Sequence, residues 1–183
     1  MSSTFPTTGK SVAGYSIDDV ERFLSAARTA FDSDRGQRGT LTSREIRRTS
    51  FPLVRGGYSI GHVDAAMARL EDAFAMREKE VAIALGREAE VLAEARAAAQ
   101  SVLDRLARGP RRRFRRAGLL GEGYDVRQVD AFSERLIGYF RSGTVLSADD
   151  VRSASFRVKT NGYSERQVDE LLDVVIEVML LVR

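Results

Sequence analysis

The side chains best suited to catalysis are scarce in this chain. It holds one histidine, His62, and no cysteine. Disulfides, thiolate metal ligands and cysteine nucleophiles are therefore excluded. No glycine-rich phosphate loop, paired-carboxylate motif or cluster of metal ligands accompanies the lone imidazole, which we interpret as a surface or capping residue. We accordingly expect no enzymatic activity, cofactor or metal.

Three carboxylates recur at one fixed position, directly after a valine near an expected helix start: Asp64, Asp130 and Asp169. The first turn of a helix carries partial positive charge, which favours acids there. The repeated spacing indicates a role in the helix dipole or in pairing, rather than catalysis.

The cations are concentrated in one short run. The formal net charge is only +3, so an anionic partner must be met by a local patch. Candidate membrane or anion contacts are Arg111, Arg112, Arg113, Phe114, Arg115, Arg116, Leu119 and Leu120, which follow Arg108. Such a cluster would suit an anionic membrane surface. It would also suit nucleic acid, or form a solvated linker whose arginines pair with nearby acids. A second candidate contact is Leu53-Val54-Arg55.

These groups are positioned by a repeat. The pattern Gly-Tyr-(Ser/Asp)-x-x-x-Val, with an acid following, occurs four times. Its glycine, tyrosine and valine are Gly14, Tyr15 and Val20; Gly57, Tyr58 and Val63; Gly123, Tyr124 and Val129; and Gly162, Tyr163 and Val168. A second pattern, Leu-(Ser/Thr)-x-x-(Asp/Glu)-(Ile/Val)-Arg-x-x-x-Phe, runs over 41–51 and again over 146–156. The order predicts a duplication, with two-motif modules at 5–75 and 110–183 joined by 76–108.

Each motif predicts a helix start. Ser16, Ser59, Asp125 and Ser164 stand where an N-cap should, between a tyrosine and a valine that form a hydrophobic staple. Gln128 and Gln167 would complete capping boxes, as would Glu45 with Thr42 and Asp150 with Ser147. The motif glycine is expected to take a positive φ and end the incoming loop.

The apolar spacing after each start is helical, and no segment shows a sustained period of two. We therefore predict an all-α fold of duplicated short helix–loop–helix modules joined by one long helix over 60–108. Only Gly86 interrupts that helix before Gly109-Pro110 ends it. Its narrow apolar face predicts either coiled-coil self-association or an intramolecular helical hairpin.

Residues 41–75 resemble the N-terminal domain of the DivIVA family, whose opening reads Leu-Thr-Pro-x-Asp-Ile, then Phe, Arg-Gly-Tyr-Asp, and a Val with an acid before a long helix. Residues 146–183 match nearly as well. The resemblance implies a scaffold of the bacterial cell-division or polar-growth machinery that gathers at septa and poles and recruits other division or cell-envelope proteins. The family's membrane-contacting Phe-Arg pair is replaced here by Arg55-Gly56 and Thr160-Asn161. The chain is more similar to actinobacterial proteins that carry the motif as repeats.

The segment 171–182 is too short to span a bilayer, and the N-terminus lacks the pattern of a signal peptide. We therefore expect a cytoplasmic scaffold or adaptor, peripheral to the inner face of the membrane near the septum or pole. It would act through helix-mediated protein contacts, with self-association as an open alternative. Nucleic-acid binding through Arg111–Arg116 is the alternative function.

Overall fold

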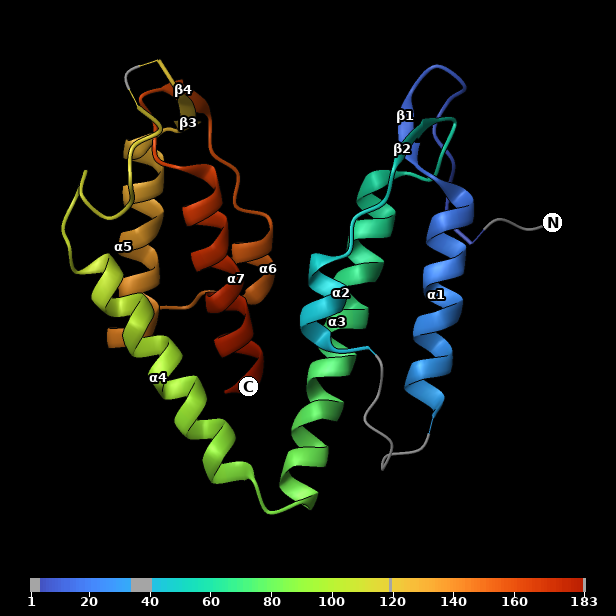
Figure 1. The fold of residues 1–183 in the computed structure, drawn as a ribbon, viewed down its shortest axis with the longest axis horizontal. Coiled ribbons are helices and arrows are strands. Elements are labelled where there is room, and N and C mark those ends of the chain that lie inside the picture. The colour runs from blue at the N-terminus through green and yellow to red at the C-terminus, as the bar shows by residue number, and fades with distance from the viewer. Residues whose placement is uncertain (1–3, 34–40, 119, 183) are drawn as a thin grey trace. The chain divides into compact units, whose positions relative to one another are not determined.

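The chain is mostly helical and divides into two compact units (Figure 1). The computed structural model describes residues 4–33, 41–118 and 120–182. Unit 1 comprises Met1–Gly86 and unit 2 comprises Arg87–Arg183. The predicted helical class is confirmed in its main content, but each unit also contains one small antiparallel strand pair, which the all-α prediction missed.

Unit 1 contains β1 (Ala13–Tyr15), α1 (Ile17–Asp32), α2 (Ser43–Arg48), β2 (Leu53–Arg55) and α3 (Ile60–Ala84). The short α2 begins with the predicted capping box, because Thr42 accepts from the backbone of Glu45 while the Glu45 carboxylate accepts from the backbone of Thr42. It packs along α3 (Figure 1). Arg47 of α2 forms a largely buried ion pair with Glu71 of α3.

Unit 2 contains α4 (Glu88–Leu106), β3 (Glu122–Tyr124), α5 (Val126–Ser142), α6 (Ala148–Arg152), β4 (Val158–Thr160) and α7 (Glu165–Leu181). The predicted capping box of Ser147 and Asp150 opens α6. Helix α6 packs on α7, and α4 packs against both α7 and α5. Helix α7 is the most deeply buried, with Val175 fully enclosed.

The strand pairs are too short for a period of two to show in the sequence. Gly14 lies opposite Val54 in unit 1, and Gly123 lies opposite Lys159 in unit 2. A three-residue strand is too short to show hydrophobic alternation, the usual signal of a strand, and its buried central residue here is a glycine, Gly14 or Gly123. The pairing depends instead on the Gly-Tyr motifs.

The single helix predicted over 60–108, including the connecting segment 76–108, is wrong. Helix α3 ends at Ala84, and α4 starts at Glu88. Gly86 adopts a φ of +69°, the left-handed conformation that terminates helices and that glycine accepts without steric cost. The residues on both sides have high helix propensity, but they do not continue the helix through Gly86.

Candidate functional site

The two Gly-Tyr motifs of unit 1 bind each other through their backbones. The Tyr15 amide donates to the Tyr58 carbonyl at 3.0 Å, and the Tyr58 amide donates to the Tyr15 carbonyl at 2.8 Å. A Cβ on Gly14 would lie 2.4 Å from the Tyr58 oxygen, and one on Gly57 would lie 2.3 Å from the Tyr15 oxygen. We call this arrangement a clasp: two Gly-Tyr dipeptides held back to back.

Unit 2 contains the same kind of clasp. Tyr124 and Tyr163 exchange two backbone hydrogen bonds, each 2.9 Å long. A Cβ on either Gly123 or Gly162 would lie 2.2 Å from a carbonyl oxygen of the opposite motif. The predicted role of the four motif glycines in reaching a positive φ is therefore wrong. None of them has a positive φ, and each allows close backbone approach instead.

The acids that follow the motif valines complete each clasp by crossing to the opposite motif's tyrosine. The Tyr58 hydroxyl donates to Glu21 at 2.5 Å, and the Tyr163 hydroxyl donates to Asp130 at 3.1 Å. Tyr124 reaches Asp169 at 3.5 Å. Of the two roles predicted for these acids, pairing describes their observed contacts.

The same contacts raise the pKa of the clasp tyrosines. Burial, followed by the Asp130 carboxylate, raises the pKa of Tyr163 to about 12. The pKa of Tyr15 is raised by burial and then by Asp64, and that of Tyr124 by burial and then by Asp169. The pKa of Tyr58 is raised by burial and then by its hydrogen bond with Glu21. Each hydroxyl is therefore held in its protonated, hydrogen-bond-donating form.

The N-cap serines differ from their predicted role. Ser16, Ser59 and Ser164 occupy N-cap positions but make no side-chain cap hydrogen bond, and only Asp125 accepts one, from Arg127.

The predicted capping boxes at Gln128 and Gln167 are also wrong. The Gln128 side-chain oxygen accepts from the Arg157 amide at 2.8 Å, and that of Gln167 accepts from the Arg115 amide at 2.9 Å. These two glutamines tie neighbouring loops to the helix starts.

The arginine run is partly internal. Arg113 is only 2% exposed, and its guanidinium donates to the Leu106 carbonyl at 2.9 Å, to Asp130 and to Glu134. Phe114 is also buried, with its ring 5.3 Å from that of Tyr163. This placement removes Arg113 and Phe114 from the predicted membrane or anion contact, because both anchor the loop from within.

Arg116 also faces the protein in part. Its guanidinium lies 5.3 Å from the centre of the Tyr163 ring and donates to the Asn161 carbonyl at 2.6 Å.

Four arginine side chains project outward around these anchors: Arg108, Arg111, Arg112 and Arg115. Their backbone is held in place, since the Arg111 amide donates to Asp130 at 2.8 Å and Arg111 adopts a φ of +64°. Leu120 follows with 96% of its surface exposed. Leu119, the remaining predicted contact here, lies outside the described residues. We call the four outward arginines and Leu120 the basic loop.

The second predicted contact, Leu53-Val54-Arg55, forms β2 and is exposed along its whole length, with Leu53 59% exposed. In unit 2 the exposed strand β4 contributes Val158 at the corresponding place. Both strand pairs therefore present aliphatic side chains and cations to solvent, as a surface contact requires.

The single histidine lies on the surface of unit 1. His62 is exposed, with its Nδ1 2.9 Å from the Ser59 hydroxyl. Within residues 4–33, 41–118 and 120–182, no cluster of three or more histidines and acids is placed to hold a metal ion. No helix among these residues is both long enough and apolar enough to cross a bilayer.

Two features of the site escaped sequence reasoning. The buried Arg113 was hidden inside a run that resembles a solvated linker, and the loop-tying glutamines resembled ordinary capping residues. The offset from Phe114 to Tyr124, matching that from Phe5 to Tyr15, was the signal that this segment packs. Comparison of the chain with protein-family models, with curated proteins and with solved structures finds no match.

Proposed function

We propose that the chain is a DivIVA-like, non-enzymatic scaffold or adaptor of bacterial cell division or polar growth that acts through protein contacts. The observation that carries this proposal is the clasp, because the residues that define the family resemblance are the ones that pair within each unit. The motif residues thus serve the fold, and the exposed surfaces around them are left for partners.

The order of elements supports a duplicated module. Each unit contains the series strand, helix, short helix, strand, helix, with a clasp between its two Gly-Tyr motifs. The two motifs that clasp belong to one chain, so we propose that each unit replaces the dimer that the family forms from two chains. Partner binding would then not depend on self-association of this protein.

We further propose weak contact with anionic membrane through the basic loop and the exposed strand pairs. Each cation near charged headgroups contributes about 1 kcal/mol, and exposed aliphatic side chains such as Leu53 and Leu120 add apolar contact. None of Arg108, Arg112 and Arg115 forms an ion pair with a described acid, which leaves their charge available. The same charges make nucleic acid the alternative ligand.

Vesicle co-sedimentation tests this contact. We expect salt-sensitive binding to vesicles containing anionic phospholipid and no binding to neutral vesicles. The double variant Arg112→Glu/Arg115→Glu should bind at least about 30-fold more weakly, from about 1 kcal/mol for each of the two lost cations, with repulsion of the two new carboxylates in addition. The double variant Arg96→Glu/Arg141→Glu makes the same change in net charge at exposed positions elsewhere and should behave like the wild type.

A fluorescent fusion tests the cellular role. Enrichment at septa or poles is expected, and uniform fluorescence would contradict the scaffold proposal. Salt-sensitive binding to duplex DNA without vesicle binding would instead favour the nucleic-acid alternative.

A further inference from the structure

Unit 2 contains one helix that unit 1 lacks. The motif spacing matches α1 with α5, α2 with α6, and α3 with α7, whereas α4 has no counterpart among the described residues of unit 1. In unit 2, α4 packs against α5 and α7. The corresponding face of α1 and α3 is therefore left without a covering helix within unit 1.

Burial along the long helices marks this face. In α7, Leu171, Val175 and Val178 are buried, at helical spacing along one stripe. When Val168 is aligned with Val63, their counterparts in α3 are Ala66, Leu70 and Ala73, and all three are only partly buried. Unit 1 has no counterpart of α4, and we attribute the lower burial of Ala66, Leu70 and Ala73 to the lack of that covering helix.

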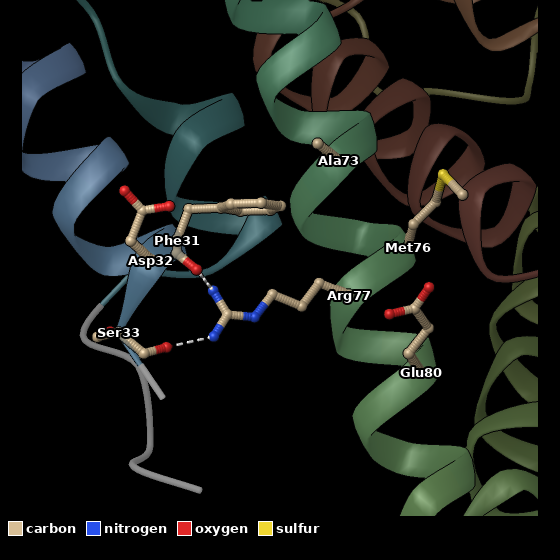
Figure 2. Close-up of a pocket in the computed structure, with 7 residues that line it drawn as sticks. All are labelled: Phe31, Asp32, Ser33, Ala73, Met76, Arg77 and Glu80. Atoms are coloured by element: carbon tan, nitrogen blue, oxygen red, sulfur yellow. Dashed lines mark hydrogen bonds between the residues drawn. The ribbon is translucent and has the colours of Figure 1, made fainter. Parts of the chain in front are cut away.

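A hollow adjoins this face between the end of α1 and the C-terminal half of α3. Its volume is about 440 Å³, and Ala73 forms part of its lining (Figure 2). The Phe31 ring extends from α1 toward α3 and lies 5.2 Å from the buried ring of Phe74. Met76, on the rim, is 66% exposed. Two of the three stripe residues are smaller than their α7 counterparts, which leaves room for an incoming side chain.

Arg77 lines the hollow and connects its two sides. Its guanidinium crosses from α3 to the end of α1, where it donates to the Phe31 and Ser33 carbonyls (Figure 2). It also donates to the Ala30 carbonyl and lies 5.1 Å from the centre of the Phe31 ring. This cation is therefore engaged with the backbone. The other charged groups lining the hollow are the carboxylates of Asp32 and Glu80, which make its rim acidic.

We propose that this face of unit 1 binds one amphipathic α-helix of a partner protein, with small and aliphatic residues along its seam and basic residues beside it. The model for the apolar seam of this occupant is α4, which buries Ala95, Val102 and Leu106. The basic residues are inferred from the acidic rim of the hollow, because α4 itself carries more acids than arginines. Helix-in-groove binding is a common mode of peptide recognition. The inference rests on the proposed adaptor function, to which it adds a surface and a kind of partner.

The test uses the full-length protein and a labelled peptide spanning residues 87–107, which carries a photo-crosslinking group. We expect saturable one-to-one binding, with crosslinks in α1 and α3. Ala73→Glu places a third carboxylate in the hollow and should weaken binding about tenfold or more, because a buried unpaired charge costs at least 1.4 kcal/mol. Ala65→Glu is the same substitution at an exposed position of α3 and should leave binding unchanged.

Absence of saturable binding would overturn the proposal, as would equal binding by the two variants or crosslinks confined to α5 and α7. Light scattering provides a further test: a wild-type dimer that Ala73→Glu converts to a monomer would place a second copy at this face, against the proposal. Loss of peptide binding with vesicle binding and septal localisation intact would refute this docking surface alone, whereas failure of those assays would refute the proposed function.

Discussion

Replacing Gly57 with alanine tests the clasp most directly. The new Cβ would lie 2.3 Å from the Tyr15 carbonyl oxygen and 2.7 Å from the Gly14 carbonyl carbon, where ordinary contacts begin at 3.4 Å. Both obstacles are backbone atoms, so the two motifs must move apart. Losing the two reciprocal hydrogen bonds costs about 1 kcal/mol each, and loosened packing around the Tyr58 ring adds about 1 kcal/mol more. We therefore expect a loss of about 3 kcal/mol, a large fraction of the roughly 5–15 kcal/mol typical of a domain.

The control for this change lies four residues further along the chain. A Cβ on Gly61 meets no atom within 4 Å. Gly61→Ala should therefore stabilise the helix by up to about 1 kcal/mol. Gly57→Asn should be as damaging as Gly57→Ala, although asparagine tolerates positive φ well.

Hydrogen exchange resolved by peptide provides the measurement. In Gly57→Ala, the protection of unit 1 amides from hydrogen exchange should fall about 100-fold, which corresponds to about 3 kcal/mol. The protection of unit 2 amides should stay unchanged. Equal protection of unit 1 in Gly57→Ala and Gly61→Ala would contradict the proposed role of the Gly57 backbone in the clasp. If Gly57→Asn kept full protection and Gly57→Ala lost it, the result would indicate that position 57 requires a positive φ.

Three further changes probe the other contacts. Because the pKa of Tyr163 is about 12 in the folded protein and near 10 when unfolded, its contribution is fully present below pH 10 and is lost as the pH rises toward 12. Urea unfolding at stepped alkaline pH should therefore show falling stability of unit 2, and a flat profile would contradict the buried hydrogen bond with Asp130. Arg113→Ala should cost about 3–5 kcal/mol by leaving the largely buried Asp130 without its cation, whereas Arg112→Ala should stay within about 0.5 kcal/mol in the same unfolding assay. Ser147→Ala should cost about 1 kcal/mol by removing the cap of α6, and an unchanged urea midpoint would exclude that capping role.

Local features were the part of this fold that the sequence could predict. The boxes of Thr42 with Glu45 and Ser147 with Asp150 connect residues three apart, and in both the side chains bind each other's backbone amides as the local spacing predicts. Gln128 has the same local geometry, but the distant Arg157 amide occupies its oxygen. The spacing alone cannot reveal that competitor, which comes from a loop elsewhere in the unit.

The clasp lies beyond such reasoning for a similar physical cause. Its hydrogen bonds connect two copies of the same dipeptide, 43 residues apart in unit 1 for Tyr15 and Tyr58 and 39 apart in unit 2 for Tyr124 and Tyr163. A repeat shows that its copies need the same local structure, and it does not show that they need each other. The glycines carried the missing signal, since a helix start requires a cap and a staple but no residue without a side chain before the tyrosine.

The roles of the motif residues indicate which parts of each unit remain available for specific partner binding. The motif glycines, tyrosines and valines are buried or partly buried in both units, so they offer partners little free surface, whereas the acids Glu21, Asp64 and Asp169 remain exposed. What differs between the units lies outside the motifs. Unit 2 uses the buried Arg113 and the covering helix α4, whereas in unit 1 the Thr4 amide donates to Tyr58 and the hollow beside Ala73 stays uncovered. The two units therefore share the clasp and differ in the elements that surround it. We therefore expect the two units to recognise different partners, even though the same residues specify how each unit folds.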